Sequence, residues 1–237
     1  MRITRSTARC LAGALLLGSA STTSANLVQN GGFETTSVVV PGSNATGLVP
    51  NWSVAFGTAI WFPGTGDVLP NASAMWGPND GSANGLPATS PAGGNYLEQD
   101  ANFVTTAFGQ TITGLTPGAT YKLGFWWGAA QWYYAASVPT TNQWFASLGA
   151  QTQSTAIVTV PYAGFKAWQH ETFYYKPRNA SEVLSFISLG SGDPPLALLD
   201  GVSLTAVPDL DTWASLGLGF AALGIAARVR RRLSPAA

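Results

Sequence analysis

The chain is poor in cysteine and in charged residues, and each shortage excludes a class of protein. Its 237 residues include one Cys and one His, too few for a disulfide framework or for a zinc site built from these residue types. Only 9% of the residues are charged, and the formal net charge is zero. A neutral average argues against nucleic-acid binding, which usually needs a basic patch. Glycine (27), proline (15) and aromatic residues (9 Trp, 7 Tyr and 11 Phe) are frequent instead, which disfavours a helical bundle.

The charges are segregated along the chain. Seven of the eleven basic residues are arginines near the two ends, within residues 2–9 and 228–232. Residues 26–207 carry four basic and nine acidic side chains, which gives this segment a net charge of −5. Such segregation indicates terminal targeting signals on either side of one mildly acidic domain.

Residues 1–25 have the features of a secretory signal peptide in the usual order. Arginines come first, an apolar run follows over residues 11–17, and small residues precede Asn26. Cleavage by signal peptidase before Asn26 would remove Cys10, so the mature protein would have no cysteine. The alternative is a short buried helix. We expect an exported protein.

A second apolar run lies near the C-terminus. Residues 212–227 are uncharged, and as a helix they would span about 24 Å, slightly less than a typical membrane span. The arginine cluster at 228–232 would hold its end on the cytoplasmic side, with Trp213 at the opposite interface. The alternative is a core helix of a globular domain. The order of features favours a single transmembrane-like helix.

The tail at 208–237 resembles the PEP-CTERM protein-sorting domain. The family motif Pro-Glu-Pro reads Pro208-Asp209-Leu210 here, a departure at two of three positions. The resemblance implies a Gram-negative, polysaccharide-secreting bacterium, transient anchoring in the inner membrane, removal of the tail by an exosortase, and delivery to the cell surface or biofilm matrix. The residues that carry it are Pro208, Asp209, Trp213, Arg228, Arg230, Arg231 and Arg232.

Residues 26–207 are enough for one domain and read as all-β. In residues 121–127, alternation places Tyr121, Leu123, Phe125 and Trp127 on one face, opposite Lys122, so this face is expected in the core. Stretches at 63–95 and 137–143 read as loops. Short apolar segments between turns predict an antiparallel two-sheet jelly-roll sandwich. The other expected strands lie at 109–113, 144–148, 156–160, 168–175, 183–187 and 198–204.

Three segments, 26–34, 110–121 and 199–204, resemble galactose-binding-like jelly rolls, a fold shared by many carbohydrate-binding modules. The resemblance implies that the first and last strands lie side by side. It also implies a structural calcium ion shared by Glu34 and Asp200, since Ca²⁺ prefers carboxylate and carbonyl oxygens. The alternative is that these acids cap turns or accept hydrogen bonds from backbone amides.

Aromatic residues cluster within residues 126–144. Flat rings can stack on the C–H faces of sugars, and a rigid aromatic surface loses little entropy on binding. The alternative is burial in the core, where most strand aromatics lie. The candidate saccharide-binding residues are Trp126, Trp132, Tyr133, Tyr134 and Trp144.

Catalysis has little support in the sequence. His170 is the only imidazole, and no Gly-x-Ser-x-Gly nucleophile motif occurs. Glu98 and Asp100 would share one face of a strand, and one short strand is a poor frame for the two acids of a glycosidase. We therefore expect a non-catalytic cell-surface or biofilm-matrix protein that binds or organises extracellular polysaccharide. The alternatives are a structural matrix or adhesion protein without a saccharide site and a polysaccharide-acting hydrolase.

Overall fold

The computed structural model describes residues 24–54, 56–68, 74–104, 106–134, 138–192 and 194–208. The expected signal peptide, the apolar run at 212–227 and the arginine cluster at 228–232 lie outside these residues, apart from the last two positions of the signal peptide. Of the sorting-motif residues, only Pro208 lies within them. Within the described ranges, no helix combines the length and hydropathy needed to span a bilayer.

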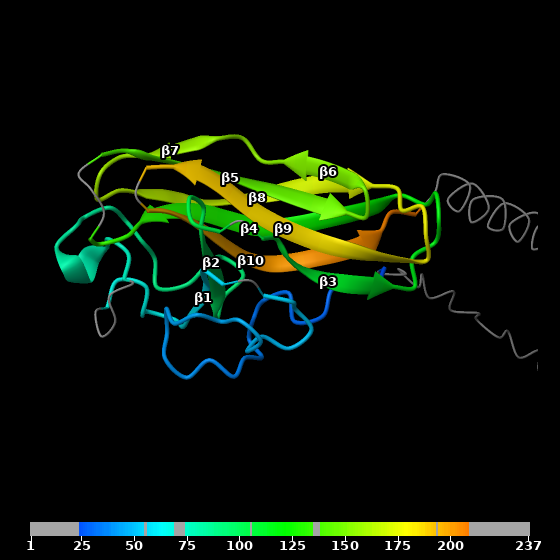
Figure 1. Cartoon of the computed structure of the whole chain (residues 1–237), viewed down its shortest axis with the longest axis horizontal. Helices are drawn as coiled ribbons and strands as arrows, with labels where there is room; N and C mark the ends of the chain where they lie inside the picture. Colours follow the sequence, from blue (N-terminus) through cyan, green and yellow to red (C-terminus); the bar gives the residue numbers. More distant parts are fainter. Residues whose placement is uncertain are drawn as a thin grey trace, which may run out of the picture.

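Two antiparallel sheets pack face to face, which confirms the all-β two-sheet sandwich (Figure 1). The first sheet has the order β1-β2-β10-β4-β8, and the second has the order β3-β9-β5-β6, with β7 also paired to β5. The only described helix is the 3-10 turn η1 (Pro78–Asp80). The strands are β1 (Thr58–Trp61), β2 (Tyr96–Asp100), β3 (Phe108–Thr113), β4 (Tyr121–Gln131), β5 (Thr140–Leu148), β6 (Gln151–Ser154), β7 (Val158–Val160), β8 (Phe165–Tyr175), β9 (Ser181–Ser191) and β10 (Pro195–Ala206).

The core between the sheets follows the alternation in the sequence. On β4 the expected inward residues are buried and Lys122 is exposed, so the predicted face is confirmed. Phe125 and Phe186 meet edge to face at 5.4 Å between ring centroids, and Phe108 stacks on Phe186 at 5.6 Å. Burial of such rings removes apolar area from water, which is the main driving force for folding.

The opening segment runs beside the last strand, as the jelly-roll resemblance implied, but it does not form the predicted strand, since the first strand of the described chain is β1. The Leu27 amide donates to the Leu204 carbonyl at 2.9 Å, and the Val202 amide donates to the Gly31 carbonyl at 2.9 Å. At the far end of β10, the Ala206 amide donates to Ser24 Oγ at 2.9 Å. The two ends of the described chain therefore lie together at one end of the sandwich (Figure 1).

Residues 62–95 form a long excursion that covers part of the outer face of the first sheet. The excursion contributes Met75 and Leu86 to a second apolar cluster on that face. These residues pack with Trp61, Tyr96 and Leu198 from β1, β2 and β10. The expected loop at 63–95 is confirmed over residues 63–68 and 74–95, apart from the single turn η1.

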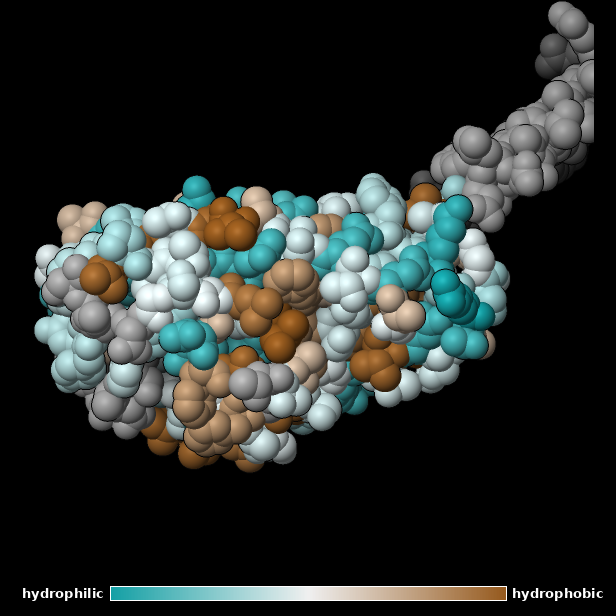
Figure 2. Space-filling model, turned by 45° about the horizontal axis from the view of Figure 1, so that its top comes forward, coloured by the Kyte–Doolittle hydropathy of each residue, from teal (hydrophilic) through white to brown (hydrophobic). Residues whose placement is uncertain are grey.

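The outer face of the second sheet is left uncovered. Val183 and Leu189 on β9 are 50% and 47% exposed, and Ile157 beside β7 is 67% exposed. Figure 2 brings the β5–β7 side of the sandwich forward and shows apolar side chains gathered in the middle of this face.

Two expectations about the strands were wrong. Residues 140–143, read as part of a loop, belong to β5, where Thr140 and Asn142 are completely buried; Thr140 pairs with β7, and Asn142 pairs with both β7 and β9. The side chains of residues 140–143 are all polar and show no apolar alternation, so this part of the strand was not predicted. In addition, β1 and β6 were not predicted, because the four residues of β1 are buried throughout and the four residues of β6 are all polar, so neither shows apolar alternation.

Candidate functional site

Trp144 is not a binding residue, contrary to the sequence-based prediction. It is completely buried between the sheets, where it meets Phe108 edge to face at 6.0 Å. Its indole N–H donates to the Leu198 carbonyl at 3.2 Å. The alternation of β5 places this residue inward, because the strand begins at Thr140 and every second residue from there is buried.

Trp126 lies apart from the other aromatic candidates. It is partly exposed on β4, next to His170 of β8, with ring centroids 5.1 Å apart in an edge-to-face arrangement. His170 is exposed on its strand, which matches the non-catalytic interpretation of this residue.

The other three candidates lie together at the end of the sandwich where β4 ends. Trp132 meets Tyr134 at 6.0 Å, and Tyr134 meets Tyr133 at 5.1 Å between ring centroids. Tyr133 continues to Trp76 at 4.4 Å, and Trp76 to Tyr162 at 5.6 Å. We call these five residues the aromatic row. Tyr134 and Tyr162 are 59% and 44% exposed, so the row forms part of the surface.

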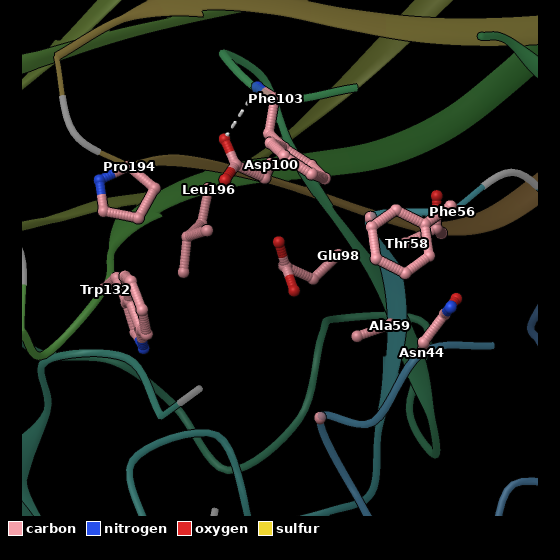
Figure 3. Close-up of a pocket in the computed structure, with 12 residues that line it drawn as sticks. Asn44, Phe56, Thr58, Ala59, Glu98, Asp100, Phe103, Trp132, Pro194 and Leu196 are labelled. Atoms are coloured by element: carbon pink, nitrogen blue, oxygen red, sulfur yellow. Dashed lines mark hydrogen bonds between the residues drawn. The ribbon is translucent and has the colours of Figure 1, made fainter. Parts of the chain in front are cut away.

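Trp132 also forms one wall of a cleft of about 410 Å³ at the edge of the first sheet (Figure 3). Phe56 and Phe103 stand across the cleft from it, and Glu98 points into the space between (Figure 3). The two phenyl rings meet at 5.6 Å and are 64% and 58% exposed. The remaining lining residues are Gly42, Asn44, Gly57, Thr58, Ala59, Asp100, Pro194 and Leu196.

Several segments distant in the sequence assemble this cleft. Strands β2 and β10 form its floor, where Leu196 of β10 pairs with Asp100 of β2 and Glu98 lies two residues along β2 from Asp100. The segment at 42–45 adds a wall by pairing Asn44 with Ala59 of β1. Gly42 is required here, because it has a φ of 73° and a Cβ atom at this position would lie 2.4 Å from the Trp61 ring.

Glu98 is the most perturbed acid of the cleft. It is 6% exposed, and burial raises the pKa of its carboxyl to about 8, with the Asp100 carboxylate acting in the same direction. The Trp61 indole favours the charged form, although its N–H has no hydrogen-bond partner of ordinary geometry. Asp100 is held differently: its Oδ1 accepts the amide N–H groups of Asn102 and Phe103 at 3.0 and 3.2 Å.

Glu34 and Asp200 are brought together, in agreement with the juxtaposition of the first and last strands. Asp200 is completely buried and accepts hydrogen bonds from Ser90 Oγ and from the Gly201 amide. Burial raises its pKa to about 7, and the Glu34 carboxylate adds to this, while the two hydrogen bonds oppose it. Glu34 is exposed and accepts the Asn95 amide at 3.0 Å. A Cβ atom at Gly94 would collide with its carboxylate, so glycine leaves the space for that group.

Glu34 and Asp200 therefore both accept hydrogen bonds from nearby groups. The alternative to a calcium site, in which these acids cap turns or accept backbone amides, requires the same arrangement. No cluster of three or more His, Cys, Asp or Glu side chains occurs within the described part of the chain. A cation at this pair would need further oxygen ligands from backbone carbonyls or water.

Comparison with known proteins identifies structural neighbours only. No protein-family model matches the sequence, and no curated protein matches it either. The structural neighbours include carbohydrate-binding modules with a β-sandwich fold.

One neighbour is TmCBM61 in complex with β-1,4-galactotriose, with 15% identity, 78% of this chain and 100% of that chain covered, and a TM-score of 0.41. A CBM4 structure has 19% identity, coverage of 76% and 99%, and a TM-score of 0.33. The C-terminal family 22 module of Clostridium thermocellum Xyn10B has 12% identity, coverage of 74% and 98%, and a TM-score of 0.38.

Among the cleft residues with an aromatic ring or an amide side chain, the sequence-based reasoning missed three: Asn44, Phe56 and Phe103. Glu98 and Asp100 were considered only as a catalytic pair. The two phenylalanines flank short strands in loop segments, and an isolated Phe in a loop gives no periodic signal. Their role depends on the pairing of β1 with β2, which places them next to each other.

Proposed function

We propose that this protein binds a saccharide in the cleft between Trp132 and the Phe56–Phe103 pair. The observation that carries the proposal is the arrangement of the cleft: aromatic rings on both sides and polar groups between them. Its volume of about 410 Å³ lies within the range of small-ligand sites, which are mostly apolar with a few placed polar groups. Rings of this kind pack on the C–H faces of a sugar, while Asn44 and the acids face its hydroxyl groups.

The aromatic row extends this surface beyond the cleft. It begins at Trp132, inside the cleft, and continues through Tyr134 and Tyr133 to Trp76 and Tyr162. A ligand that used both surfaces would be longer than one or two sugar units. We therefore propose a polysaccharide chain as the ligand, with one unit in the cleft and neighbouring units along the row.

The location of the cleft suits display at a surface. The cleft lies where β10 begins, and the ends of the described chain meet where β10 ends. The length of β10 separates the cleft from the ends of the described chain by roughly 30 Å. If the terminal signals act as the sequence predicts, the protein is exported, held transiently at the inner membrane and delivered to the cell surface or matrix, with its cleft directed away from the anchor.

We propose in addition that Glu34 and Asp200 hold a structural calcium ion. The two carboxylates lie close together, and Glu34 raises the pKa of Asp200, so a cation at this position would relieve their repulsion. The ion would join the opening segment to β10 and supply only cohesion. We assign no catalytic role to any residue.

Glycan-array binding with the purified chain and with the polysaccharide of its own source organism tests the saccharide proposal. Phe56→Ala and Phe103→Ala should each weaken binding about tenfold or more, because they remove one wall of the cleft from an already exposed position. Tyr174→Ala is the matched control, since Tyr174 is 56% exposed on β8 and does not line the cleft. Binding that survives both Phe variants would refute the cleft as the site. The absence of any glycan binding would refute the function.

A second candidate is a structural matrix protein that acts through protein contacts. The observation that favours it is the uncovered apolar face of the second sheet, with Val183, Leu189 and Ile157 exposed. Substitution of these residues by Ser would then weaken matrix assembly and leave glycan binding unchanged.

A further inference from the structure

Charged side chains are divided unevenly between the two sheets. The strands of the second sheet contain one, Glu182 on β9, which is 8% exposed and accepts the backbone amides of Arg178 and Asn179. The strands of this sheet therefore present no charge on its outer face, although residues 26–207 carry a net charge of −5. The charged residues on the strands of the first sheet are Glu98, Asp100, Lys122, Lys166, Glu171 and Asp200.

Apolar side chains stand on this uncharged outer face. Every second residue of β5 and β9 points outward, and Phe145 lies opposite Ile187 near the middle of the two strands. Val183 and Leu189 on β9 and Ile157 beside β7 are exposed. Figure 2 shows apolar side chains gathered in the middle of the face. A contiguous exposed apolar area of this kind marks an interaction site.

Polar side chains between the apolar ones are bonded to each other across the strands. The hydroxyl groups of Thr141 on β5 and Ser191 on β9 lie 2.7 Å apart. Those of Ser147 on β5 and Thr152 on β6 lie 2.8 Å apart. Polar groups without partners are costly to bury, whereas bonded pairs can be removed from water at lower cost. The face can therefore be covered without leaving these hydroxyl groups unpaired.

The absence of charge on the face points to a second copy of the chain as its partner. Recognition of a different protein usually uses complementary charges, which the strands of this face do not provide. Two copies with a net charge of −5 repel each other through their acids, and contact through an uncharged face keeps those acids apart. A two-fold contact sets one patch against its own copy, so apolar side chains would meet apolar side chains.

The size of the face agrees with this partner. At about 3.4 Å per residue and about 4.8 Å between strands, the five strands of the sheet cover roughly 500 Å². Two such faces would bury roughly 1,000 Å² in projection, which is about the minimum for specific association. Sheets pack face to face at about 10 Å, as the two sheets of one sandwich do. The area predicts a reversible dimer rather than a permanent one.

We propose that the outer face of the second sheet is a homodimer interface, in which the faces of two copies pack against each other about a two-fold axis. This inference names the partner for the second candidate function and does not rest on saccharide binding. The cleft lies at the edge of the first sheet, so both clefts of a dimer remain open. The dimer would therefore present two binding sites to a polymer.

Sedimentation velocity of the purified chain tests the interface, and dimer should accumulate as the concentration rises from about 1 to 200 µM. Val183→Glu and Leu189→Glu bring identical charges together at the contact and should each raise the dissociation constant at least about tenfold. Tyr174→Glu is the matched control, because it adds the same charge at an exposed position of β8 in the first sheet and should retain dimerisation. All of these chains have the same terminal segments, so a difference between them reports the face.

Cysteine crosslinking provides a second measurement. With Cys10 replaced by Ser, Ile187→Cys has a single thiol near the middle of the face. Oxidation should join two copies covalently through this position. Tyr174→Cys, with its thiol on the other sheet, should remain monomeric under the same conditions.

The outcomes separate this inference from the saccharide proposal. A chain that sediments as a monomer throughout, or association that is equally strong in Val183→Glu, Leu189→Glu and Tyr174→Glu, would overturn the dimer. Loss of glycan binding in the two face variants with no change in association would also overturn it and would assign the face to a glycan. Array binding by the unaltered chain and by Phe56→Ala tests the cleft separately, so either proposal can fail while the other stands.

Discussion

Glu98 occupies a position that the sequence describes only in part. Its spacing from Asp100 correctly predicts that the two acids share one face of a strand, since both line the same cleft. The depth of burial could not be predicted, because the residues that enclose Glu98 come from segments around positions 44, 56 and 132. The spacing of two acids on one strand therefore indicates a site only once the positions of those segments in the fold are known.

The burial of Glu98 leads to a prediction about stability and pH. Its carboxyl titrates at 4.5 in the unfolded reference and at about 8 in the folded protein. Below pH 4.5 the Glu98 carboxyl is protonated in both the folded and the unfolded chain, and the free energy of unfolding is at its highest as far as this group is concerned. Between these values only the unfolded chain ionises, so the free energy of unfolding should fall as the pH rises to 8, by a few kcal/mol at about 1.4 kcal/mol per pKa unit.

Thermal melting between pH 5 and pH 8, in the presence of a chelator, measures this effect. Glu98→Gln should remove much of the decline in Tm, while Glu171→Gln should retain it. Part of the decline should persist in Glu98→Gln, because the pKa of Asp200 is also raised, to about 7. An unchanged slope in Glu98→Gln would contradict the assignment of a buried protonated carboxyl.

Single residues also show where alternation is a reliable guide. On β4 the alternation correctly separates the buried Trp127 from the partly exposed Trp126. For Trp144 the same rule would have predicted burial, had the strand been recognised from Thr140 onward. The polar residues before it read as a loop, so its direction was left undetermined and its aromatic character alone suggested a binding role.

At the scale of elements, the sequence predicted most of the strands that alternate between apolar and polar residues and missed β1 and the all-polar β6, which do not. β1 is buried on both faces, because the excursion at 62–95 covers its outer side, and a fully buried strand has no period of two. Sequence patterns identified the excursion as a loop but gave no indication of where it packs.

The contact between the opening segment and β10 leads to the calcium prediction. Added Ca²⁺ should raise the Tm of the purified chain, and a chelator should reverse the increase, because the ion would bind only the folded arrangement of Glu34 and Asp200. The increase should be larger at pH 8 than at pH 5, since protonation of Asp200, whose pKa is about 7, removes a ligand charge.

Asp200→Asn should abolish this response to calcium, and Glu182→Gln, which alters an acid on β9 away from the pair, should retain it. Identical melting curves with calcium and with chelator at both pH values would refute the calcium proposal. In that case the two acids act only through their hydrogen bonds with Ser90, Gly201 and Asn95.

At the scale of the whole molecule, the sandwich separates its chain ends from its cleft. The Ala206 amide bonds to Ser24 at one end of β10, and Leu196 lines the cleft at the other. The sequence predicts signals at both ends of the chain, and the fold brings the adjoining residues Ser24 and Ala206 together on the side opposite the cleft. This placement of the chain ends and the cleft at opposite ends of the sandwich arises from the fold and cannot be inferred from either terminal motif.

Site-specific labelling tests this placement, and the sequence is suited to it because residues after Cys10 include no other cysteine. With Cys10 removed, Asn44→Cys places one thiol at the rim of the cleft, and Thr116→Cys places one in the exposed turn near the chain ends, where Val207 bonds to Thr120. Coupling a bulky maleimide to position 44 should reduce glycan binding at least about tenfold, because the label fills the space that a sugar would occupy. The same label at position 116 should leave binding unchanged, and immobilisation through that thiol should leave the cleft accessible. Loss of binding on labelling position 116, or retention on labelling position 44, would place the binding surface at the end of the sandwich that carries the termini.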